Sequence, residues 1–176
     1  MDKNFKYKRI IILGGTGSGK SSLAKRMGEY TGYPVLHLDT LFRDEKFGQK
    51  DKSEWESLQN SFLRNVYGVV EGNYSKVLPQ RIDWSDLIIF IDIPTRVRMV
   101  RLLKRYLKNW LGIDRRVGYF LKKKDKLSLE LVRWALIWNK NSRPKTVELL
   151  KNTSDKKILF IKDPKKLNLK NLFNKD

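Results

Sequence analysis

The sequence predicts an α/β fold in which helices cover both faces of a parallel β-sheet. Two observations lead to this prediction. Short apolar runs typical of strands alternate with segments of helical periodicity along the chain, as in proteins built from β–α–β units. The run at residues 87–91 is apolar at every position, which is typical of a strand covered on both faces. A chain of 176 residues suits one core, so we expect a single domain over residues 1–176.

Five short, mostly apolar runs are expected to be the strands. They lie at residues 9–13, 34–38, 68–71, 87–93 and 157–161. Apolar residues at helical spacing predict helices at residues 21–30, 53–66, 95–110, 128–141 and 145–151. We expect the last two helices to be separate, because Asn141-Ser142-Arg143-Pro144 is typical of a helix end. We expect the lysine-rich tail after the last strand to be a solvated surface.

The helix expected over residues 95–110 carries two stripes of side chains. One stripe is apolar, and we expect it to face the core; it consists of Val100, Leu103, Leu107 and Trp110. The other stripe is cationic, with spacings that place its members on one helical face; it consists of Arg98, Arg101, Arg105 and Lys108. Like charges at this spacing repel one another, and no acidic residue is interleaved. The pattern therefore favours a face that meets phosphate over a plain exposed basic face.

Residues 14–21 read Gly-Gly-Thr-Gly-Ser-Gly-Lys-Ser, which completes the phosphate-loop pattern G-x-x-x-x-G-K-[ST]. The pattern follows a predicted strand and precedes a predicted helix, as this motif requires. Its backbone amides and the helix N-terminus attract phosphate, while Lys20 reaches the β- and γ-phosphates and the Ser21 hydroxyl ligates Mg²⁺. The sequence therefore predicts a three-layer P-loop NTPase fold. The expected phosphate-binding residues are Gly15, Thr16, Gly17, Ser18, Gly19, Lys20, Ser21 and Ser22.

Composition narrows the classes of function. The net charge is +19, and residues 96–176 carry most of it, with 24 Lys and Arg against 7 Asp and Glu, a balance of +17. Such a charge attracts polyanions such as nucleoside triphosphates or nucleic acid. The chain has no cysteine, which excludes disulfides and thiolate metal sites. Since there is also no run of about 18 apolar residues, we expect a cytoplasmic protein without a membrane partner.

Several segments taken together resemble the adenylate-kinase-like P-loop kinases, and most closely the FlaR-type proteins described as DNA topology modulation proteins. The matching segments lie at residues 11–21, 37–42, 70–75, 86–92, 102–108 and 142–145. The resemblance implies a five-stranded parallel sheet of order 2-3-1-4-5 with helices on both faces. It also implies an acceptor-binding insertion at about residues 40–66, a basic helical lid at about residues 109–128, and the use of ATP and Mg²⁺.

The same resemblance implies roles for particular residues. Arg101 and Arg105 match two arginines on the helix that enters the lid, where Arg98 is a substitute for the first. Glu71, followed by glycine, matches an acid that holds a Mg²⁺-bound water. The segment after that glycine contains Tyr74, and it lacks the arginine that binds the acceptor phosphate in adenylate kinases. We expect Arg81 to replace it.

For some residues the sequence allows more than one role. Asp39 ends the second strand, and it either orients or deprotonates an acceptor hydroxyl or caps the next segment. Asp92 is a rival to Glu71 as the residue that serves the metal. A clamp on the γ-phosphate by Arg105 could also involve Arg101, Arg143 or two lid arginines, Arg115 and Arg116. For His37, the single histidine, we expect a structural role.

Two functions from different classes fit these residues. The first is a kinase, a phosphotransferase that moves the γ-phosphate of ATP to a nucleoside monophosphate or another small acceptor. The second is a nucleotide-dependent DNA-binding protein that uses the basic C-terminal half on a phosphate backbone. The arginine stripe beside the expected lid favours the kinase. We expect a monomer or a homodimer.

Overall fold

The structure, a computed structural model, describes residues 5–39, 52–111 and 129–174. Five strands form one sheet: β1 (Arg9–Gly14), β2 (Val35–His37), β3 (Gly68–Glu71), β4 (Leu87–Ile91) and β5 (Lys157–Ile161). The strand order is β2-β3-β1-β4-β5, and every neighbouring pair is parallel. This is the order 2-3-1-4-5 that the sequence resemblance implied, so that expectation is confirmed.

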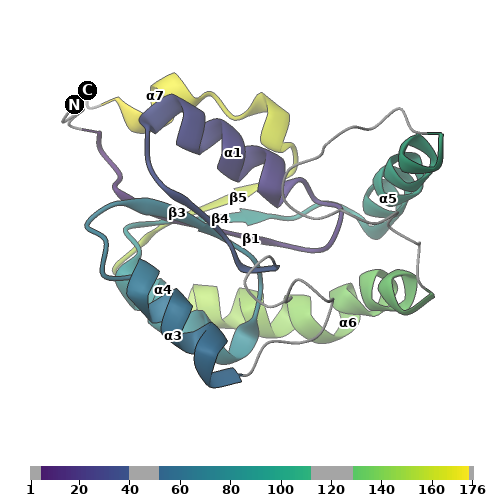
Figure 1. Ribbon diagram of the computed structural model, residues 1–176, viewed down its shortest axis with the longest axis horizontal. Helices are drawn as coiled ribbons and strands as arrows, with labels where there is room; N and C mark the ends of the chain where they lie inside the picture. The colour runs from purple at the N-terminus through teal and green to yellow at the C-terminus, as the bar shows by residue number, and fades with distance from the viewer. Residues whose placement is uncertain (1–4, 40–51, 112–128, 175–176) are drawn as a thin grey trace.

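Helices cover both faces of the sheet (Figure 1). The longer helices are α1 (Lys20–Thr31), α3 (Lys52–Phe62), α5 (Thr95–Trp110) and α6 (Leu129–Lys151). The shorter ones are η1 (Ser75–Val77), α4 (Leu78–Trp84), η2 (Pro164–Lys166) and α7 (Leu169–Phe173). In Figure 1, α1 and α7 lie above the sheet, and α3, α4 and α6 lie below it. The chain therefore has the three layers predicted from the sequence.

Each face of the sheet has its own apolar core, because successive side chains of a strand point to opposite sides. On β1, Ile10 and Ile12 pack with α1 and α7, whereas Ile11 and Leu13 pack with residues of α3, α4 and α6. All four side chains are completely buried. Since β1 lies between β3 and β4, the loop after β1 leaves the sheet where the connections diverge, which is where ligands bind in open α/β sheets.

Helix α6 corrects one expectation, because it is continuous where the sequence predicted two helices. Pro144 lies inside it and removes one backbone hydrogen-bond donor. Both halves of the helix are held by the same core, through Trp138 before the proline and Leu150 after it, and each of these is about 1% exposed. We attribute the continuity to this shared packing, which offsets the cost of the proline.

Helix α5 corrects a second expectation, because it is turned so that its apolar stripe faces outward. Val100, Leu103 and Leu107 are about half exposed, at 49%, 50% and 52%. The inward positions are Arg98 and Leu102, at 0% and 2%. The first half of the cationic stripe lies inward, because Arg98 and Arg101 bond to the phosphate loop and Arg98 also bonds to α6, as described below. The side chain of Trp110, the fourth residue of the predicted stripe, lies outside the described residues.

The C-terminal segment corrects a third expectation, since part of it belongs to the core and is not a solvated surface. Leu169 and Phe173 of α7 are buried against α1 and β1. The ring of Phe173 lies 5.4 Å from that of Phe5 and 5.9 Å from that of Tyr30. The two ends of the described chain therefore close the upper core together (Figure 1).

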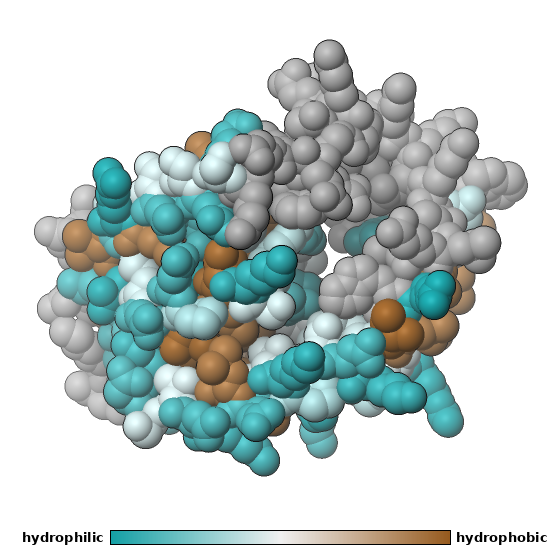
Figure 2. All heavy atoms as spheres, turned by 90° about the horizontal axis from the view of Figure 1, so that it is seen from below, coloured by the Kyte–Doolittle hydropathy of each residue, from teal (hydrophilic) through white to brown (hydrophobic). Residues whose placement is uncertain are grey.

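The outer surface of the lower layer is mostly hydrophilic. Figure 2 views this side of the molecule, and hydrophobic residues appear there as separate patches among polar ones. Within residues 5–39, 52–111 and 129–174, none of the helices has the length and apolar character that crossing a bilayer requires.

Candidate active site

The predicted phosphate-binding residues form one loop and the helical turn that follows it. Residues 15–19 connect β1 to α1, and Lys20, Ser21 and Ser22 form the first turn of α1. Gly17 and Gly19 have φ angles of +81° and +100°, which residues with a side chain rarely adopt. A Cβ on Gly17 would also lie 2.8 Å from the Arg98 carbonyl oxygen. The sequence therefore places glycine where the loop turns sharply against α5.

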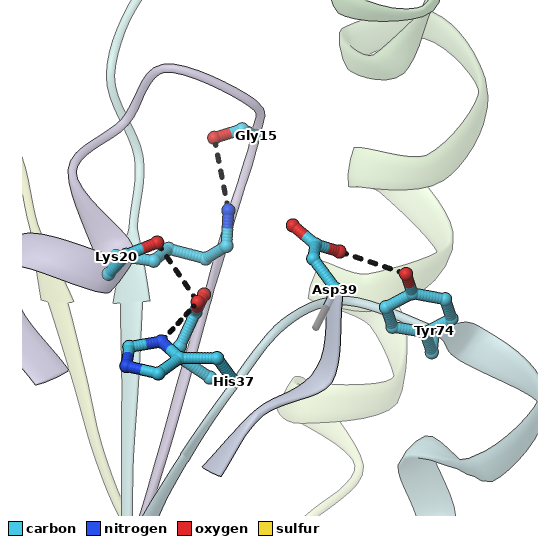
Figure 3. A network of polar contacts seen from close by, with 7 residues as sticks. Gly15, Lys20, His37, Asp39 and Tyr74 are labelled. Carbon is cyan, nitrogen blue, oxygen red and sulfur yellow. Dashed lines mark hydrogen bonds and ion pairs between the residues drawn. The ribbon is translucent and has the colours of Figure 1, made fainter. Parts of the chain in front are cut away.

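The N-terminus of α1 has the features of an anion site. The N-cap residue is Gly19, and no side chain caps the helix there. The uncapped amides and the helix dipole both favour a negative ligand at this end. The Lys20 ammonium lies over the loop, at 3.5 Å from the Gly15 carbonyl oxygen (Figure 3). A bound phosphate would thus meet backbone donors and a cation together.

A carboxylate lies beside the first turn of α1 (Figure 3). Glu71 ends β3 and is completely buried, and its Oε1 accepts hydrogen bonds from Ser21 Oγ and from His37 Nδ1, each at 2.9 Å. His37 and Glu71 are register partners on adjacent parallel strands, which brings their side chains together. Burial opposes ionisation of Glu71, but the His37 hydrogen bond and the charge of Lys20 hold its pKa below the ordinary value. Glu71 is therefore a carboxylate.

These oxygen atoms fit a magnesium ion. Glu71 Oε2 is buried and has no hydrogen-bond partner among the described residues, so one strong acceptor is unused. Mg²⁺ prefers oxygen ligands and takes only one or two from protein in phosphate-transfer sites, with the rest from phosphate and water. No cluster of three or more His, Cys, Asp or Glu side chains that could hold a metal ion occurs in the described part of the chain.

The rival metal residue, Asp92, is engaged elsewhere. It follows β4, and both of its carboxylate oxygens accept from Arg143, at 2.8 and 2.6 Å. This bidentate pair holds the pKa of Asp92 below its ordinary range and raises that of Arg143. The structure thus pairs two predicted site residues with each other. Of the two acids, Glu71 is the one with an oxygen to spare beside Ser21.

A second polar group lies at the end of β2. The Tyr74 hydroxyl donates to Asp39 Oδ1 at 2.9 Å (Figure 3). The Tyr74 ring also packs on that of Trp55, with centroids 5.2 Å apart. Among the described residues, Tyr74 alone has a positive φ without being glycine, at +29°. Such strained backbone is concentrated at functional sites. The predicted acceptor residues Asp39 and Tyr74 are therefore brought together, whereas the segment that Asp39 could cap lies outside the described residues.

Arg81 does not take the place that we expected for an acceptor-phosphate ligand. Its side chain is completely buried and donates to the carbonyl oxygens of Gly72, Asn73, Tyr74 and Val77. These carbonyl oxygens surround the guanidinium, so that none of its surface is accessible to a ligand. Arg81 therefore shapes the loop after β3 in this structure. Its burial lowers its pKa to about 9.

Asn73 is a site residue that the sequence analysis missed. Its side-chain amide bonds twice to Gly14, accepting from the backbone N–H at 3.1 Å and donating to the carbonyl at 2.9 Å. These bonds tie the loop after β3 to the start of the phosphate loop. The sequence contained a signal for this role. Asn73 directly follows Glu71 and Gly72, just after the strand that was expected to lie beside β1.

The arginine stripe of α5 lies partly against the phosphate loop. Arg98 is buried and donates to the Thr16 carbonyl at 3.2 Å, and Arg101 donates to the Ser18 carbonyl at 3.1 Å. Arg105 and Lys108 are exposed one and two turns further along. The predicted lid, with Arg115 and Arg116, lies outside the described residues apart from its first three positions.

Similar folds occur among solved structures. The chain resembles a gluconokinase from Sinorhizobium meliloti 1021, at 17% identity, with 94% of this chain and 86% of that one covered and a TM-score of 0.50. It also resembles a shikimate kinase from Bacteroides thetaiotaomicron, at 17% identity, with 90% and 87% covered and a TM-score of 0.51. These likenesses confirm the α/β fold of P-loop kinases. No protein-family model matches the chain, and a search of curated proteins finds no match.

Proposed function

We propose that this protein is a kinase that transfers the γ-phosphate of ATP to a small acceptor bound beside Asp39 and Tyr74. The main support for the proposal is that three parts of the site lie together at one edge of the sheet. These parts are the phosphate loop, the Ser21–Glu71 oxygens and the Asp39–Tyr74 pair. The two similar structures are a gluconokinase and a shikimate kinase, and they support this class of reaction.

The phosphate loop binds and orients the triphosphate. Its amides and the N-terminus of α1 hold the phosphate oxygens, and Lys20 offsets negative charge on the group in transfer. Ser21 and Glu71 would hold Mg²⁺, which would supply positive charge to offset the negative charge of the phosphates. His37 fixes the orientation of the Glu71 carboxylate through its hydrogen bond. Arg101 supports the loop from the side of α5.

Asp39 serves the acceptor. Its carboxylate accepts the proton of the acceptor hydroxyl as that oxygen forms a bond to the γ-phosphorus. The bond between this phosphorus and the bridging oxygen breaks, and ADP leaves with that electron pair. Tyr74 holds Asp39 through its hydroxyl, which fixes the direction of the carboxylate. Such positioning contributes a large part of catalysis in phosphate transfer.

Of the two acceptor classes expected from the sequence, a small hydroxylated molecule is favoured over a nucleoside monophosphate. An acceptor phosphate needs a cation, and among the described residues Arg81 is buried under the loop after β3 while Arg143 is paired with Asp92. The groups that the structure describes beside Asp39 are aromatic and hydroxyl-bearing, namely Trp55 and Tyr74. These groups suit a neutral or weakly charged acceptor with hydroxyl groups.

The experiment is an ATP-consumption screen against nucleoside monophosphates, sugars and small hydroxy acids. We expect a hydroxylated acceptor to stimulate turnover, and Asp39→Asn to slow it by about 10²-fold or more with ATP binding unchanged. Asp83→Asn, which changes an exposed carboxylate on α4, is the matched control and should retain full turnover. The proposal fails if no acceptor stimulates turnover, or if Asp39→Asn turns over as fast as the unmodified protein.

Nucleotide-dependent DNA binding is the second candidate, and the net charge of +19 is the observation that favours it. It agrees with the resemblance to the FlaR-type proteins, which stays a prediction. The kinase proposal is preferred because the two inner arginines of α5 point to the phosphate loop and not to an outer surface.

A further inference from the structure

Arg98 is a completely buried arginine beneath the phosphate loop. Its guanidinium donates to five acceptors, and each of them is electrically neutral. They are the carbonyl oxygens of Ile93, Thr16 and Ala135, the Thr95 hydroxyl and the Asn139 amide oxygen. The guanidinium also lies 5.1 Å from the ring centroid of Trp138, which is a cation–π distance. One side chain therefore links the loop, the start of α5 and the middle of α6.

No carboxylate bonds to Arg98 among the described residues. The acid that acts on it through space is Asp92, and both oxygens of Asp92 already accept from Arg143. A buried cation without a bonded counter-ion is costly, and an arginine cannot escape the cost by losing its proton. Among the described residues, the positive charge of Arg98 therefore has no carboxylate bonded to it.

The loop places an anion close to this charge. The carbonyl of Thr16 accepts from Arg98, and the N–H of the same peptide group belongs to Gly17. In a trans peptide these two groups point in opposite directions, so a cation on the carbonyl side strengthens the donor on the other side. The guanidinium also packs against Gly15, since a Cβ built there would clash with it at 2.4 Å.

We propose that Arg98 is a positioning residue whose buried charge is balanced by the phosphates of the bound nucleotide, so that it sets the preference of the loop for ATP over ADP. This inference rests on the proposed function, because it requires a nucleotide in the phosphate loop. The sequence resemblance gave Arg98 only as a substitute for Arg101 in a pair of arginines on the helix that enters the lid. In the structure it acts from behind the loop, through the Thr16–Gly17 peptide.

The test is calorimetric binding of ATP, ADP and AMP without metal, so that each added phosphate adds charge. Arg98→Gln removes the charge, and we expect the ratio of ATP to ADP affinity to fall by about tenfold. Arg98→Lys keeps the charge and should retain the ratio within about twofold, although overall affinity falls with the lost hydrogen bonds. A role that is only structural would weaken all three nucleotides alike.

Arg26→Gln is the matched control, because Arg26 also donates to backbone carbonyl oxygens, those of Pro164, Lys165 and Leu167, none of which belongs to residues 14–21. It should lower the melting temperature and leave the affinity ratio unchanged. The inference about Arg98 would be overturned by an unchanged ratio of ATP to ADP affinity in Arg98→Gln. It would also be overturned by a tenfold decrease of that ratio in Arg98→Lys. Either result would leave the proposed function standing. If Arg98→Gln does not fold, Asn139→Asp takes its place, since it puts a carboxylate on the Arg98 guanidinium. The ratio should then fall, and an unchanged ratio would overturn the inference. Absence of nucleotide binding by the unmodified protein would instead overturn the proposed function itself.

Discussion

Three buried charged side chains organise the residues of the site. Glu71 lies beside the first turn of α1, Arg98 lies behind the phosphate loop, and Arg81 lies under the loop after β3. The first retains an oxygen for a metal ion, while the second and third hold carbonyl oxygens of the two loops that would meet the substrates. Buried ionic groups are costly, so their place here is better explained by function than by stability.

Among the residues of the site, the sequence predicted those that follow one another directly along the chain. The phosphate loop could be predicted because its glycines, lysine and serine follow one another along the chain. The His37–Glu71 bond could have been inferred only with the register of β2 and β3, because the two residues are 34 positions apart. The burial of Arg81 could not be inferred, since its four acceptors are backbone carbonyls that any sequence would supply.

The Asp92–Arg143 pair gives a prediction on pH. The hydrogen bond from Arg143 lowers the pKa of Asp92 in the folded protein, so the folded state binds fewer protons than the unfolded state does. The stability that the pair contributes is therefore present above the ordinary carboxyl pKa of about 4, and it is lost as the pH falls below that value. We expect Asp92→Asn to flatten the loss of melting temperature between about pH 5 and about pH 3. Coincident pH profiles for the two proteins would contradict the assignment.

Among the elements, α5 shows how tertiary contacts override an apolar pattern. Periodicity located the helix with its ends at Thr95–Trp110, but it assigned the apolar stripe to the core. The side that carries Arg98, Arg101 and Leu102 lies inward instead, because the two arginines bond to the phosphate loop and Leu102 packs beside Gly17. A pattern of hydrophobicity alone contains no information about those acceptors.

The orientation of α5 can be tested with two adjacent leucines. Leu102 is 2% exposed and Leu103 is 50% exposed. We expect Leu102→Ala to lower the free energy of unfolding by about 2–4 kcal/mol, because it leaves a cavity beside the loop. Leu103→Ala should change it by less than about 1 kcal/mol. Urea titration of both variants measures this difference, and the reverse ranking would mean that the apolar stripe faces the core after all.

Over the whole molecule, charge and function are divided between the two halves of the chain. The first half builds β1, the phosphate loop and the Glu71 and Asp39 sites, whereas the second half carries a balance of +17 and supplies α5 and α6. The strand order and the layers were predictable because strands and helices alternate and because a family resemblance supplied the order. The acceptor was not predictable, since it depends on which side chains remain accessible after folding.

The positive charge allows a salt titration to separate the two candidate functions. If the protein is a kinase, we expect duplex DNA to bind it only through general attraction, and to leave acceptor-stimulated ATP turnover unchanged. That DNA affinity should fall by orders of magnitude between about 50 and about 200 mM salt. Fluorescence anisotropy with labelled duplex measures it. Tight DNA binding near 200 mM salt that required ATP, without turnover on any acceptor, would favour the DNA-binding candidate.

The central claim is that the loop at residues 14–21 binds the phosphates of ATP, and a crystal structure with a non-hydrolysable ATP analogue tests it most directly. The account predicts the triphosphate on the loop amides, with Lys20 in contact with its terminal phosphate and a metal ion between Ser21 and the phosphate oxygens. In the Lys20→Ala variant the same soak should give weak or no density for the analogue. An analogue bound elsewhere on the molecule, with the loop empty, would contradict the account.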